Sequence, residues 1–404
     1  MKVVTAGTGM AAAEFVQRLR FEGYDGEIVM YGDEDFPPYS PCIIPFYLAG
    51  EPLETVYWKG ADFYEKYGVV ARLGDPVMEV DAGRRTIKTA AGRSESYDKL
   101  FYATGAGSWY PHPEWLATAG VFGFKTLTDM VEIDRYVSEQ GIKKAVVFGG
   151  GFIGVDAALA LRSRGLDVTM VHRNTRLLSQ MTDEEGGQFA TRKLAEKTGM
   201  DIRLRTTVED IVSSDGQLSA VRLASGETVD TALLILAVGV TPNSQPLNGE
   251  SRGVKGSGQM LCDPCIYAAG DVAVTRHAVT GADGIYANYP NAMQQARIAA
   301  RHLVHGDGTY SGSINTTVLK KHIDFPVISA GSFSGEAVTW QRGDIWRRVY
   351  LLDGMINGYI VIGDTRLSGY LYQLYVSRKL VDKTIRTALS ETGHDGFYRD
   401  MLGL

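Results

Sequence analysis

Two glycine-rich turns of one type, about 140 residues apart, restrict the possible folds of this chain more than any other feature. The first turn, at residues 7–12, has the sequence GTGMAA, and the second, at residues 149–154, has the sequence GGGFIG. Each follows a short β-rich run and opens a segment with helical periodicity. A strand, a glycine turn and a helix in this order form a dinucleotide-binding unit. The sequence therefore predicts two α/β units, each with a site for one dinucleotide.

The residues of the first turn have separate tasks. Gly7 permits a tight turn, Gly9 lets the backbone approach a pyrophosphate, and Ala12 keeps the helix close to the sheet. The helix N-terminus adds a positive field for the phosphates. An acidic residue near the end of the next predicted strand should bind a ribose hydroxyl, and Asp33 and Glu34 are the two candidates.

Basic residues follow the second turn at the position that selects between the two nicotinamide dinucleotides. The residues that we assign to the turn itself are Gly149, Gly151, Ile153 and Gly154. The next predicted strand ends at His172 and Arg173, with Arg176 nearby, where an acid would otherwise bind a 2′-hydroxyl. An arginine fork matches phosphate geometry, so these cations favour the 2′-phosphate of NADPH. A solvated basic turn is the alternative, and NADH stays open.

A single cysteine, Cys42, lies on an apolar segment between Pro41 and Pro45. The two prolines stiffen the turn, and Pro45 suits the first turn of a short helix that runs toward Leu48. Cys42 would then lie near the helix N-terminus, where the dipole favours a thiolate. A small buried hydrophobic side chain is the more common role of a lone cysteine.

Composition excludes several classes of protein. A net charge of −6 with interspersed signs gives no support for a nucleic-acid partner, and the longest apolar run, at residues 232–240, is too short for a membrane span. The start of the chain lacks a secretory signal pattern, and three cysteines suit a reducing compartment, so we expect a cytoplasmic protein. Three cysteines are also too few to hold an iron–sulfur cluster within this chain. The seven histidines form no metal-binding or hydrolase signature.

The sequence CDPC at residues 262–265 is a possible redox pair or half of a zinc site. No second CxxC and no cluster of histidines accompanies it, so we interpret Cys262 and Cys265 as two ordinary thiols and predict no metal site.

Three further segments complete a specific set. They are ATG at residues 103–105, GVTPN at residues 239–243 and AAGD at residues 268–271. In this order, and together with the two glycine turns, they resemble the FAD- and NAD(P)-dependent pyridine nucleotide–disulfide oxidoreductase superfamily. The resemblance covers the whole chain. It implies an α/β fold with two Rossmann-like three-layer domains, which bind FAD and NAD(P), and a C-terminal α+β interface domain.

The resemblance also implies domain boundaries and roles for single residues. The FAD-binding domain would comprise residues 1–110 and 237–312, the NAD(P)-binding domain residues 111–236, and the interface domain residues 313–404. The first glycine turn would bind FAD and the second NAD(P)H. The further cofactor-binding residues that it implies are Thr104, Gly105 and Asp271 for FAD, Gly239 in the GxxPN-like segment, and Asp156 near the nicotinamide.

Within the superfamily, the C-x-x-P-[FY] pattern around Cys42 looks like the branch of coenzyme A-disulfide reductases and NADH oxidases, where one cysteine faces the flavin. Two hypotheses follow. The chain could couple NAD(P)H to a second acceptor as a flavin subunit of a larger complex with an iron–sulfur partner. Alternatively, it could be a stand-alone coenzyme A-disulfide reductase or NADH oxidase with Cys42 as the catalytic redox thiol. The interface domain of such relatives usually builds a homodimer.

Overall fold

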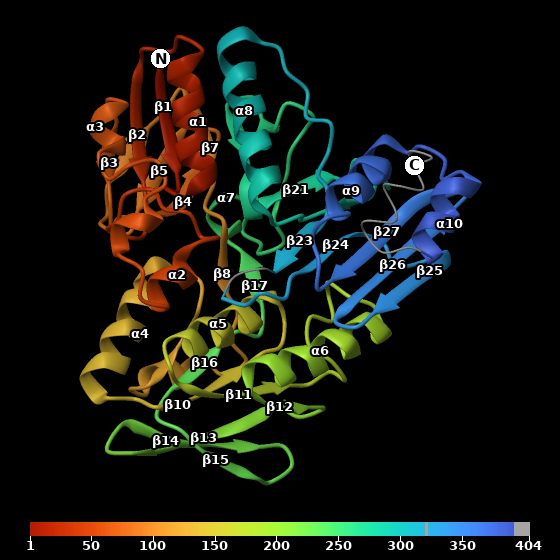
Figure 1. The fold of residues 1–404 in the computed structure, drawn as a ribbon. Helices are drawn as coiled ribbons and strands as arrows, with labels where there is room; N and C mark the ends of the chain where they lie inside the picture. The colour runs from red at the N-terminus through yellow and green to blue at the C-terminus, as the bar shows by residue number, and fades with distance from the viewer. Residues whose placement is uncertain (320–321, 392–404) are drawn as a thin grey trace.

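The computed structural model describes residues 1–319 and 322–391, which form three units around a common centre (Figure 1). The N-terminal unit is built on a six-stranded sheet. Its strands in spatial order are β19 (Leu261–Asp263), β20 (Ile266–Ala268), β7 (Lys99–Tyr102), β1 (Lys2–Ala6), β2 (Glu27–Tyr31) and β3 (Val70–Arg72). All neighbours except β19 and β20 run parallel. Two stretches of chain about 160 residues apart therefore share one sheet.

Both faces of this sheet are covered, as a parallel sheet requires. Helices α1 (Met10–Phe21) and α8 (Tyr289–His305) lie side by side on one face, where alanines let them approach closely (Figure 1). The other face packs against the antiparallel sheet of β4 (Val77–Asp81), β5 (Thr86–Thr89) and β6 (Ser94–Ser96). The unit thus has three layers.

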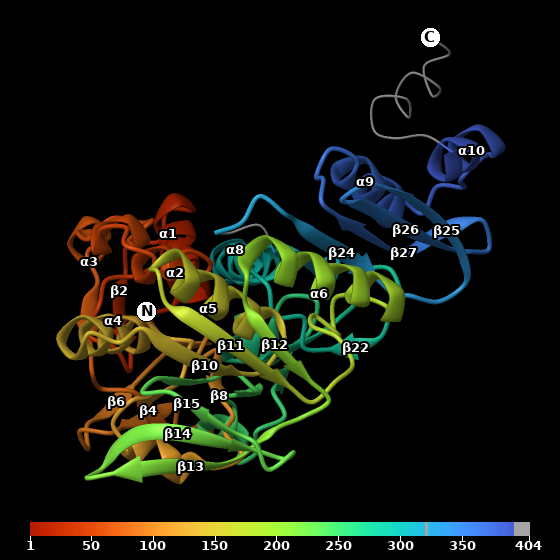
Figure 2. The ribbon, with the colours of Figure 1, turned by 60° about the horizontal axis from the view of Figure 1, so that its bottom comes forward.

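The central unit repeats this plan around a five-stranded parallel sheet. Its strands in spatial order are β12 (Asp201–Leu204), β11 (Asp167–His172), β10 (Lys144–Phe148), β16 (Leu234–Leu236) and β9 (Val121–Phe122). One face carries α4 (Leu127–Gln140), α5 (Phe152–Ser163) and α6 (Glu184–Thr198). The other face carries β13 (Val208–Ser214), β14 (Gln217–Leu223) and β15 (Thr228–Asp230), and Figure 2 shows them beneath the sheet.

The C-terminal unit is an antiparallel sheet that is covered on both faces. Its strands in spatial order are β23 (Thr316–Leu319), β24 (Val327–Gly331), β27 (Met355–Ile362), β26 (Ile345–Leu352) and β25 (Glu336–Arg342). One face packs under α9 (Ser368–Ser377) and α10 (Lys383–Glu391), where Tyr375 is fully buried. The opposite face, with Trp346 and Tyr350, joins the core of the central unit. Residues 392–404 of the predicted interface domain lie outside the described residues.

Shorter elements connect the units. They are α2 (Ile44–Leu48), η1 (Leu53–Val56), α3 (Phe63–Lys66), β8 (Ala106–Ser108), η2 (Pro113–Ala117), β17 (Val240–Pro242), α7 (Gln245–Asn248), β18 (Val254–Lys255), η3 (Gly270–Val272), β21 (Ala273–Arg276) and β22 (Asp283–Gly284). Helix α2 follows Cys42 and packs on α4 and α5, with Ile44 and Leu48 in the core of the central unit (Figure 1).

Among the helices that the structure describes, none combines the length and the apolar character that a membrane span requires.

Candidate functional site

The first glycine turn leaves an open cradle at the start of α1. Gly7 has φ +110°, and a Cβ there would stand 2.2 Å from the carbonyl oxygen of Ala103, so the close approach of the two strands requires glycine. Gly9 is the N-cap of α1, and no atom lies within 4 Å of the place where its Cβ would be. Ala12 is fully buried between α1 and the sheet. Exposed backbone N–H groups at a helix N-terminus fit a pyrophosphate.

A cavity of about 280 Å³ opens beside this turn. Among the residues that line it are Gly7, Asp33, Thr104 and Asn243. Three residues that the sequence assigned to the first dinucleotide therefore share one cavity, and Asn243 joins them from the GVTPN segment. Its lining combines polar residues such as Asp33 and Asn243 with apolar ones such as Pro76 and Val77, as is typical of sites for small molecules.

Glu34, the second candidate for the ribose, is turned away from this cavity. Its Oε1 accepts hydrogen bonds from the backbone N–H and the Oγ1 of Thr128, both at 2.9 Å, and its other oxygen accepts one from the hydroxyl of Tyr39. The Tyr39 hydroxyl in turn accepts from the N–H of Leu127 at 3.2 Å. Glu34 and Tyr39 thus cap the N-terminus of α4, whereas Asp33 is among the residues that line the cavity.

The ATG and GVTPN segments form one paired structure, because β8 and β17 lie antiparallel. Thr104 Oγ1 donates to the carbonyl oxygen of Asn243 at 2.7 Å, and Asn243 Nδ2 donates back to the carbonyl oxygen of Thr104 at 3.0 Å. The N–H of Asn243 donates to the carbonyl oxygen of Gly105. Gly239 accepts from the N–H of Trp109 at 3.0 Å, just before β17. This pairing holds Thr104 and Asn243 at the cavity wall, and Gly105 follows Thr104.

Asp271 lies in the short helix η3, directly after Gly270, whose φ is +80°. A Cβ on Gly270 would stand 3.4 Å from the Cβ of Ala11, so the Asp271 turn abuts the start of α1. Lys125 Nζ lies 3.7 Å from Asp271 Oδ2. Sequence reasoning missed Lys125, which reaches the turn from the segment before α4 and carries no local signal of that role.

The second glycine turn has the same geometry as the first. Gly149 has φ +129°, and a Cβ there would stand 2.1 Å from the carbonyl oxygen of Ala237. Gly151 caps α5 with nothing within 4 Å of its Cβ position, whereas a Cβ on Gly154 would meet the carbonyl oxygen of Gly149 at 1.9 Å. Ile153 is half-buried in the first turn of α5, and Asp156, one turn later, is 4% exposed. A second open cradle therefore faces out of the central sheet.

His172 does not act as a cation in this structure. The ring is 9% exposed and lies against Gly150, whose N–H donates to His172 Nδ1 at 3.0 Å. Burial and the nearby charges of Arg173 and Arg176 lower the pKa of His172 to about 4. The imidazole is therefore neutral near pH 7, with its proton on Nε2. The sequence predicted a positively charged His172 at a 2′-phosphate. The prediction is wrong about the charge, because the buried ring accepts a hydrogen bond from Gly150 and stays neutral.

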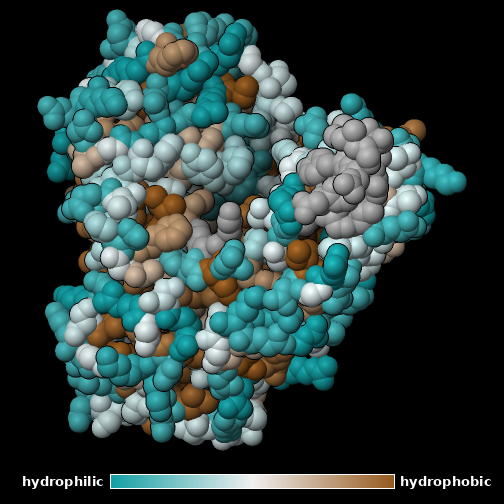
Figure 3. Space-filling model, viewed as in Figure 1, coloured by the Kyte–Doolittle hydropathy of each residue, from teal (hydrophilic) through white to brown (hydrophobic). Residues whose placement is uncertain are grey.

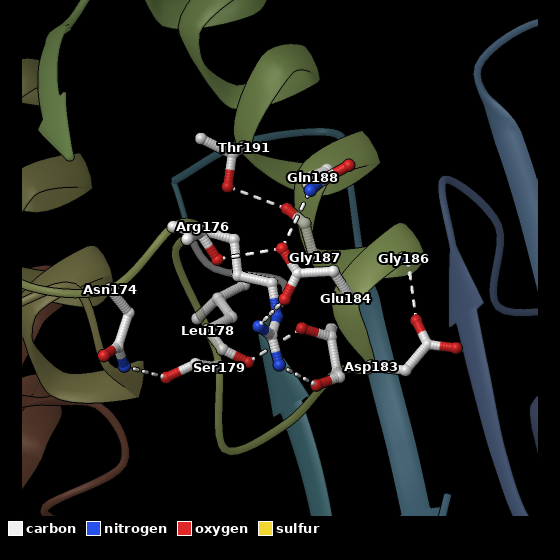
Figure 4. Close-up of polar contacts among 12 residues, drawn as sticks. Asn174, Arg176, Leu178, Ser179, Asp183, Glu184, Gly186, Gly187, Gln188 and Thr191 are labelled. Atoms are coloured by element: carbon white, nitrogen blue, oxygen red, sulfur yellow. Dashed lines mark hydrogen bonds and ion pairs between the residues drawn. The ribbon is translucent and has the colours of Figure 1, made fainter. Parts of the chain in front are cut away.

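Three arginines nevertheless gather at the ends of β11 and β12, and two of them, Arg173 and Arg205, are exposed. Arg176 is bound by Glu184 in an ion pair and donates from Nη2 to the carbonyl oxygen of Thr182 at 3.3 Å (Figure 4). Arg173 is exposed, and so is Arg205, whose N–H donates to the carbonyl oxygen of Asn174, the residue after Arg173, at 3.1 Å. A hollow of about 470 Å³ adjoins Arg205, lined by residues 202–206, 223–225 and 227. The sequence contains no signal for Arg205. This residue follows β12 and comes near Arg173 only because β12 pairs with β11 in the folded sheet.

Cys42 is exposed and lies two residues before α2, in which Pro45 is in the first turn as the sequence predicted. Helix α2 has only five residues, so its dipole is weaker than the sequence argument assumed. In Figure 3, which has the same view as Figure 1, apolar surface lies near the middle of the molecule at the height of α2. Burial first, then the charges of Glu14 and Cys42, raise the pKa of Tyr289, which indicates that these groups are close together.

An ion cluster that the sequence did not reveal adjoins Cys42. The Trp58 ring stands edge-on to Tyr289 at 5.7 Å, and Lys59 Nζ lies 4.1 Å from the centre of the same Trp58 ring. Lys59 Nζ also binds Glu14 Oε2 at 2.5 Å, and Glu14 Oε1 binds Arg297 Nε at 2.5 Å. Salt bridges to both cations lower the pKa of the buried Glu14 carboxyl against an opposing effect of burial, which is the largest single influence. The cluster fixes α1 and α8 beside the Cys42 turn.

Cys262 and Cys265 have the surroundings of packing residues. Burial raises the pKa of the Cys262 thiol to about 12, and its Sγ donates to the carbonyl oxygen of Ile266 at 3.4 Å. Cys265 is 8% exposed in the core under the N-terminal sheet.

Comparison with known proteins agrees with this geometry. The sequence model of the family "Pyridine nucleotide-disulphide oxidoreductase" matches residues 1–296. The chain is 28% identical to the assimilatory nitrate reductase electron transfer subunit of Bacillus subtilis (strain 168), over 90% of this chain and 48% of that protein. It therefore spans about half the length of that relative.

Two further relatives are matched over more of their length. The NAD(P)H coenzyme A polysulfide/persulfide reductase of Pyrococcus horikoshii is 29% identical over 79% of this chain and 73% of that protein. The NADH-dependent phenylglyoxylate dehydrogenase subunit epsilon of Aromatoleum evansii is 26% identical over 93% of this chain and 92% of that protein. Among solved structures, putidaredoxin reductase in its covalent complex with putidaredoxin has a TM-score of 0.89 at 24% identity, covering 100% of this chain and 98% of that one.

Proposed function

The chain belongs to the pyridine nucleotide-disulphide oxidoreductase family, and from this premise we propose that it transfers electrons between NAD(P)H and a partner electron carrier, as the flavin module of a larger redox system. The predicted superfamily and the mixed α/β fold are confirmed. Relatives named as ferredoxin–NAD(P)(+) and rubredoxin–NAD(+) reductases support the class of FAD-dependent NAD(P)H:acceptor oxidoreductase, which belongs to the proposal. FAD and NAD(P)H are the cofactors expected for the family. The partner, the choice of nicotinamide and the site residues belong to the proposal.

The observation that carries the proposal is the pair of open cradles at Gly9 and Gly151, one on each parallel sheet. When bound, FAD supplies the chemistry that accepts a hydride and releases electrons. In the proposal, the N–H groups at the start of α1 bind the FAD diphosphate and Asp33 binds a ribose hydroxyl. Thr104, Gly105 and Gly239 then shape the wall between the units, and Asp271 orients the flavin end. This division keeps the predicted boundaries, with FAD on residues 1–110 and 237–312.

The central unit, residues 111–236, binds NAD(P)H in the same proposal. The N-terminus of α5 binds the pyrophosphate, and Gly149 and Gly154 let the chain approach it closely. Asp156, one turn into α5, is the residue that would lie toward the nicotinamide. Arg173 and Arg205 are the cations available for a 2′-phosphate, which favours NADPH without excluding NADH.

An iron–sulfur protein is the proposed partner. The relatives from Bacillus subtilis and Aromatoleum evansii are named as an electron transfer subunit and as a subunit of a dehydrogenase. The C-terminal unit, residues 313–404, is the proposed interface for a homodimer or for a partner. Exposed apolar side chains on it, such as Leu352 and Leu380, support this role.

A stand-alone disulfide or persulfide reductase is the second candidate, favoured by the exposure of Cys42 and by the Pyrococcus relative. Steady-state oxidation of NADH and NADPH by the purified yellow protein separates the two. We expect ferredoxin and a viologen to exceed coenzyme A disulfide and oxygen as acceptors, and Cys42→Ser to keep the rates with ferredoxin. Preference for coenzyme A disulfide, with loss of that activity in Cys42→Ser, would establish the alternative.

A further inference from the structure

The turn that carries Asp271 is held by a side chain from α8. Gln295 is 2% exposed, and its Oε1 accepts a hydrogen bond from the N–H of Gly270 at 2.8 Å. Gly270 has φ +80° and directly precedes Asp271. The amide oxygen of Gln295 is therefore the acceptor for the backbone donor of the turn. Local sequence alone does not determine the direction in which this turn leaves β20.

The other end of the Gln295 amide enters a buried polar network. Gln295 Nε2 donates to Ser313 Oγ at 3.4 Å, and Ser313 Oγ is bonded to Thr275 Oγ1 at 2.7 Å and to the Tyr310 hydroxyl at 2.8 Å. Ser313 is fully buried and Thr275 is 5% exposed. Because a buried network loses much of its stability when one member is unsatisfied, the network fixes the amide in a single orientation.

The far end of the network is anchored where the chain passes into the C-terminal unit. The N–H of Ser313 donates to the carbonyl oxygen of Arg276 at 2.8 Å, and the N–H of Ala278 donates to the carbonyl oxygen of Ser313 at 2.9 Å. The next residue, Ile314, donates its N–H to Asn291 Oδ1 on α8 at 3.1 Å. The network thus ties the Asp271 turn, α8 and the entry to β23 into one rigid block.

We propose that Gln295 is a positioning residue for Asp271, and that the affinity of the protein for FAD depends on the hydrogen bond from Gly270 to Gln295. Without this acceptor the part-buried N–H of Gly270 loses its partner, and the turn relaxes toward water, which moves the Asp271 carboxylate. The inference rests on the proposed function, because it takes Asp271 to contact FAD.

The test compares two substitutions of nearly equal size. Gln295→Met removes the acceptor and keeps the shape, whereas Gln295→Glu keeps an oxygen that can accept from Gly270. Apoprotein is titrated with FAD, and the quenching of flavin fluorescence gives the dissociation constant. We expect Gln295→Met to weaken FAD binding about tenfold and Gln295→Glu to recover most of the loss, as expected for one buried hydrogen bond.

Two controls separate positioning from general stability. Tyr310→Phe removes a hydroxyl at the outer end of the network and should change the FAD dissociation constant less than about twofold, since the bond to Gly270 stays. Urea unfolding of each apoprotein measures stability without FAD. A Gln295→Met variant that lowers the urea midpoint but binds FAD like the wild type would overturn the inference, as would a Glu variant no better than Met. Absence of FAD binding by the wild type would instead overturn the proposed function.

Discussion

At the scale of the residue, the fold decides the charge state of His172. The ring is neutral because burial disfavours its protonated form and because Nδ1 accepts from the N–H of Gly150. If Nδ1 were protonated, its N–H and the N–H of Gly150 would face each other as two donors with no acceptor between them. His172 therefore couples the shape of the second glycine turn to pH.

This coupling predicts a loss of stability in mild acid. The folded pKa of about 4 lies below the ordinary value of 6.5, so the unfolded chain takes up the proton first. The contribution of His172 is complete above about pH 6.5 and is lost as the pH falls toward 4, by at most about 3 kcal/mol. Urea unfolding between pH 4 and 7 measures it. In His172→Asn, whose amide oxygen can accept from Gly150, this part of the slope should vanish, and an unchanged slope would contradict the assignment.

The exposed arginines predict the choice of nicotinamide. Replacing Arg173 or Arg205 by Ala should raise the KM for NADPH about tenfold or more, the value of a hydrogen bond to a charged group, and leave the KM for NADH nearly unchanged. Initial rates with both dinucleotides check this.

Arg203→Ala is the matched control for these arginines. Arg203 lies on β12, two residues before Arg205, but is engaged with Asp201 at 2.9 Å and Glu227 at 3.3 Å, so its loss should affect neither KM. If Arg173→Ala raised the KM for NADPH and the KM for NADH equally, Arg173 would not be a ligand of the 2′-phosphate.

At the scale of the element, the segment before Cys42 is attached to the central unit. Glu34 and Tyr39 satisfy the N–H groups of Thr128 and Leu127 at the start of α4. Burial and the Glu34 carboxylate raise the pKa of Tyr39 far above its usual range, so the hydroxyl keeps its proton. The capping box within α4, from Thr126 and Asp129, completes this helix end. The Cys42 turn therefore depends on α4 for its position.

Loss of this attachment should destabilise the protein measurably. Glu34→Ala exchanges two exposed hydrogen bonds from Thr128 for bonds to water and removes a negative charge from a helix N-terminus, which should lower the free energy of unfolding by about 1 kcal/mol. Glu34→Gln retains an acceptor and should cost less. Urea unfolding of the holoprotein provides the measurement, with the exposed Glu51→Ala as the control. A Glu34→Ala variant as stable as Glu51→Ala would exclude a capping role.

The elements themselves were largely predictable, whereas contacts between distant segments were not. The turns at Gly7 and Gly149 follow from local pattern, because a strand, a glycine and a helix in sequence leave few conformations. The burial of His172, the approach of Arg205 and the capping by Glu34 depend on which strands and helices become neighbours. No local periodicity encodes these contacts. The sequence therefore predicted a charged His172 and could not choose between Asp33 and Glu34 for the ribose.

At the scale of the whole molecule, α6 and β26 connect the central and C-terminal units. Asp183, the N-cap of α6, accepts from Arg348 Nη1 at 2.8 Å and from the hydroxyl of Tyr350. At the edge of the same contact, Lys193 and Lys197 bind Asp344 at 3.0 and 2.9 Å. The central unit and the C-terminal unit thus share one polar seam, formed by the contacts of Asp183 and Asp344, which fixes the position of one unit relative to the other.

The two parts of this seam should differ in strength. The Arg348 and Asp183 side chains are 15% and 11% exposed, so Arg348→Met leaves a nearly buried carboxylate without its cation and should cost about 3 kcal/mol. Lys197→Met breaks a pair whose Asp344 side chain is half exposed and should cost less than about 1 kcal/mol.

Hydrogen–deuterium exchange followed by mass spectrometry can compare β26 and β27 with β10. In Arg348→Met the amides of β26 and β27 should exchange many times faster while β10 changes little, because the C-terminal unit then opens separately. Equal exchange in the two variants would mean that the units are held together by the apolar contact of Trp346 with α6 rather than by the ion pair.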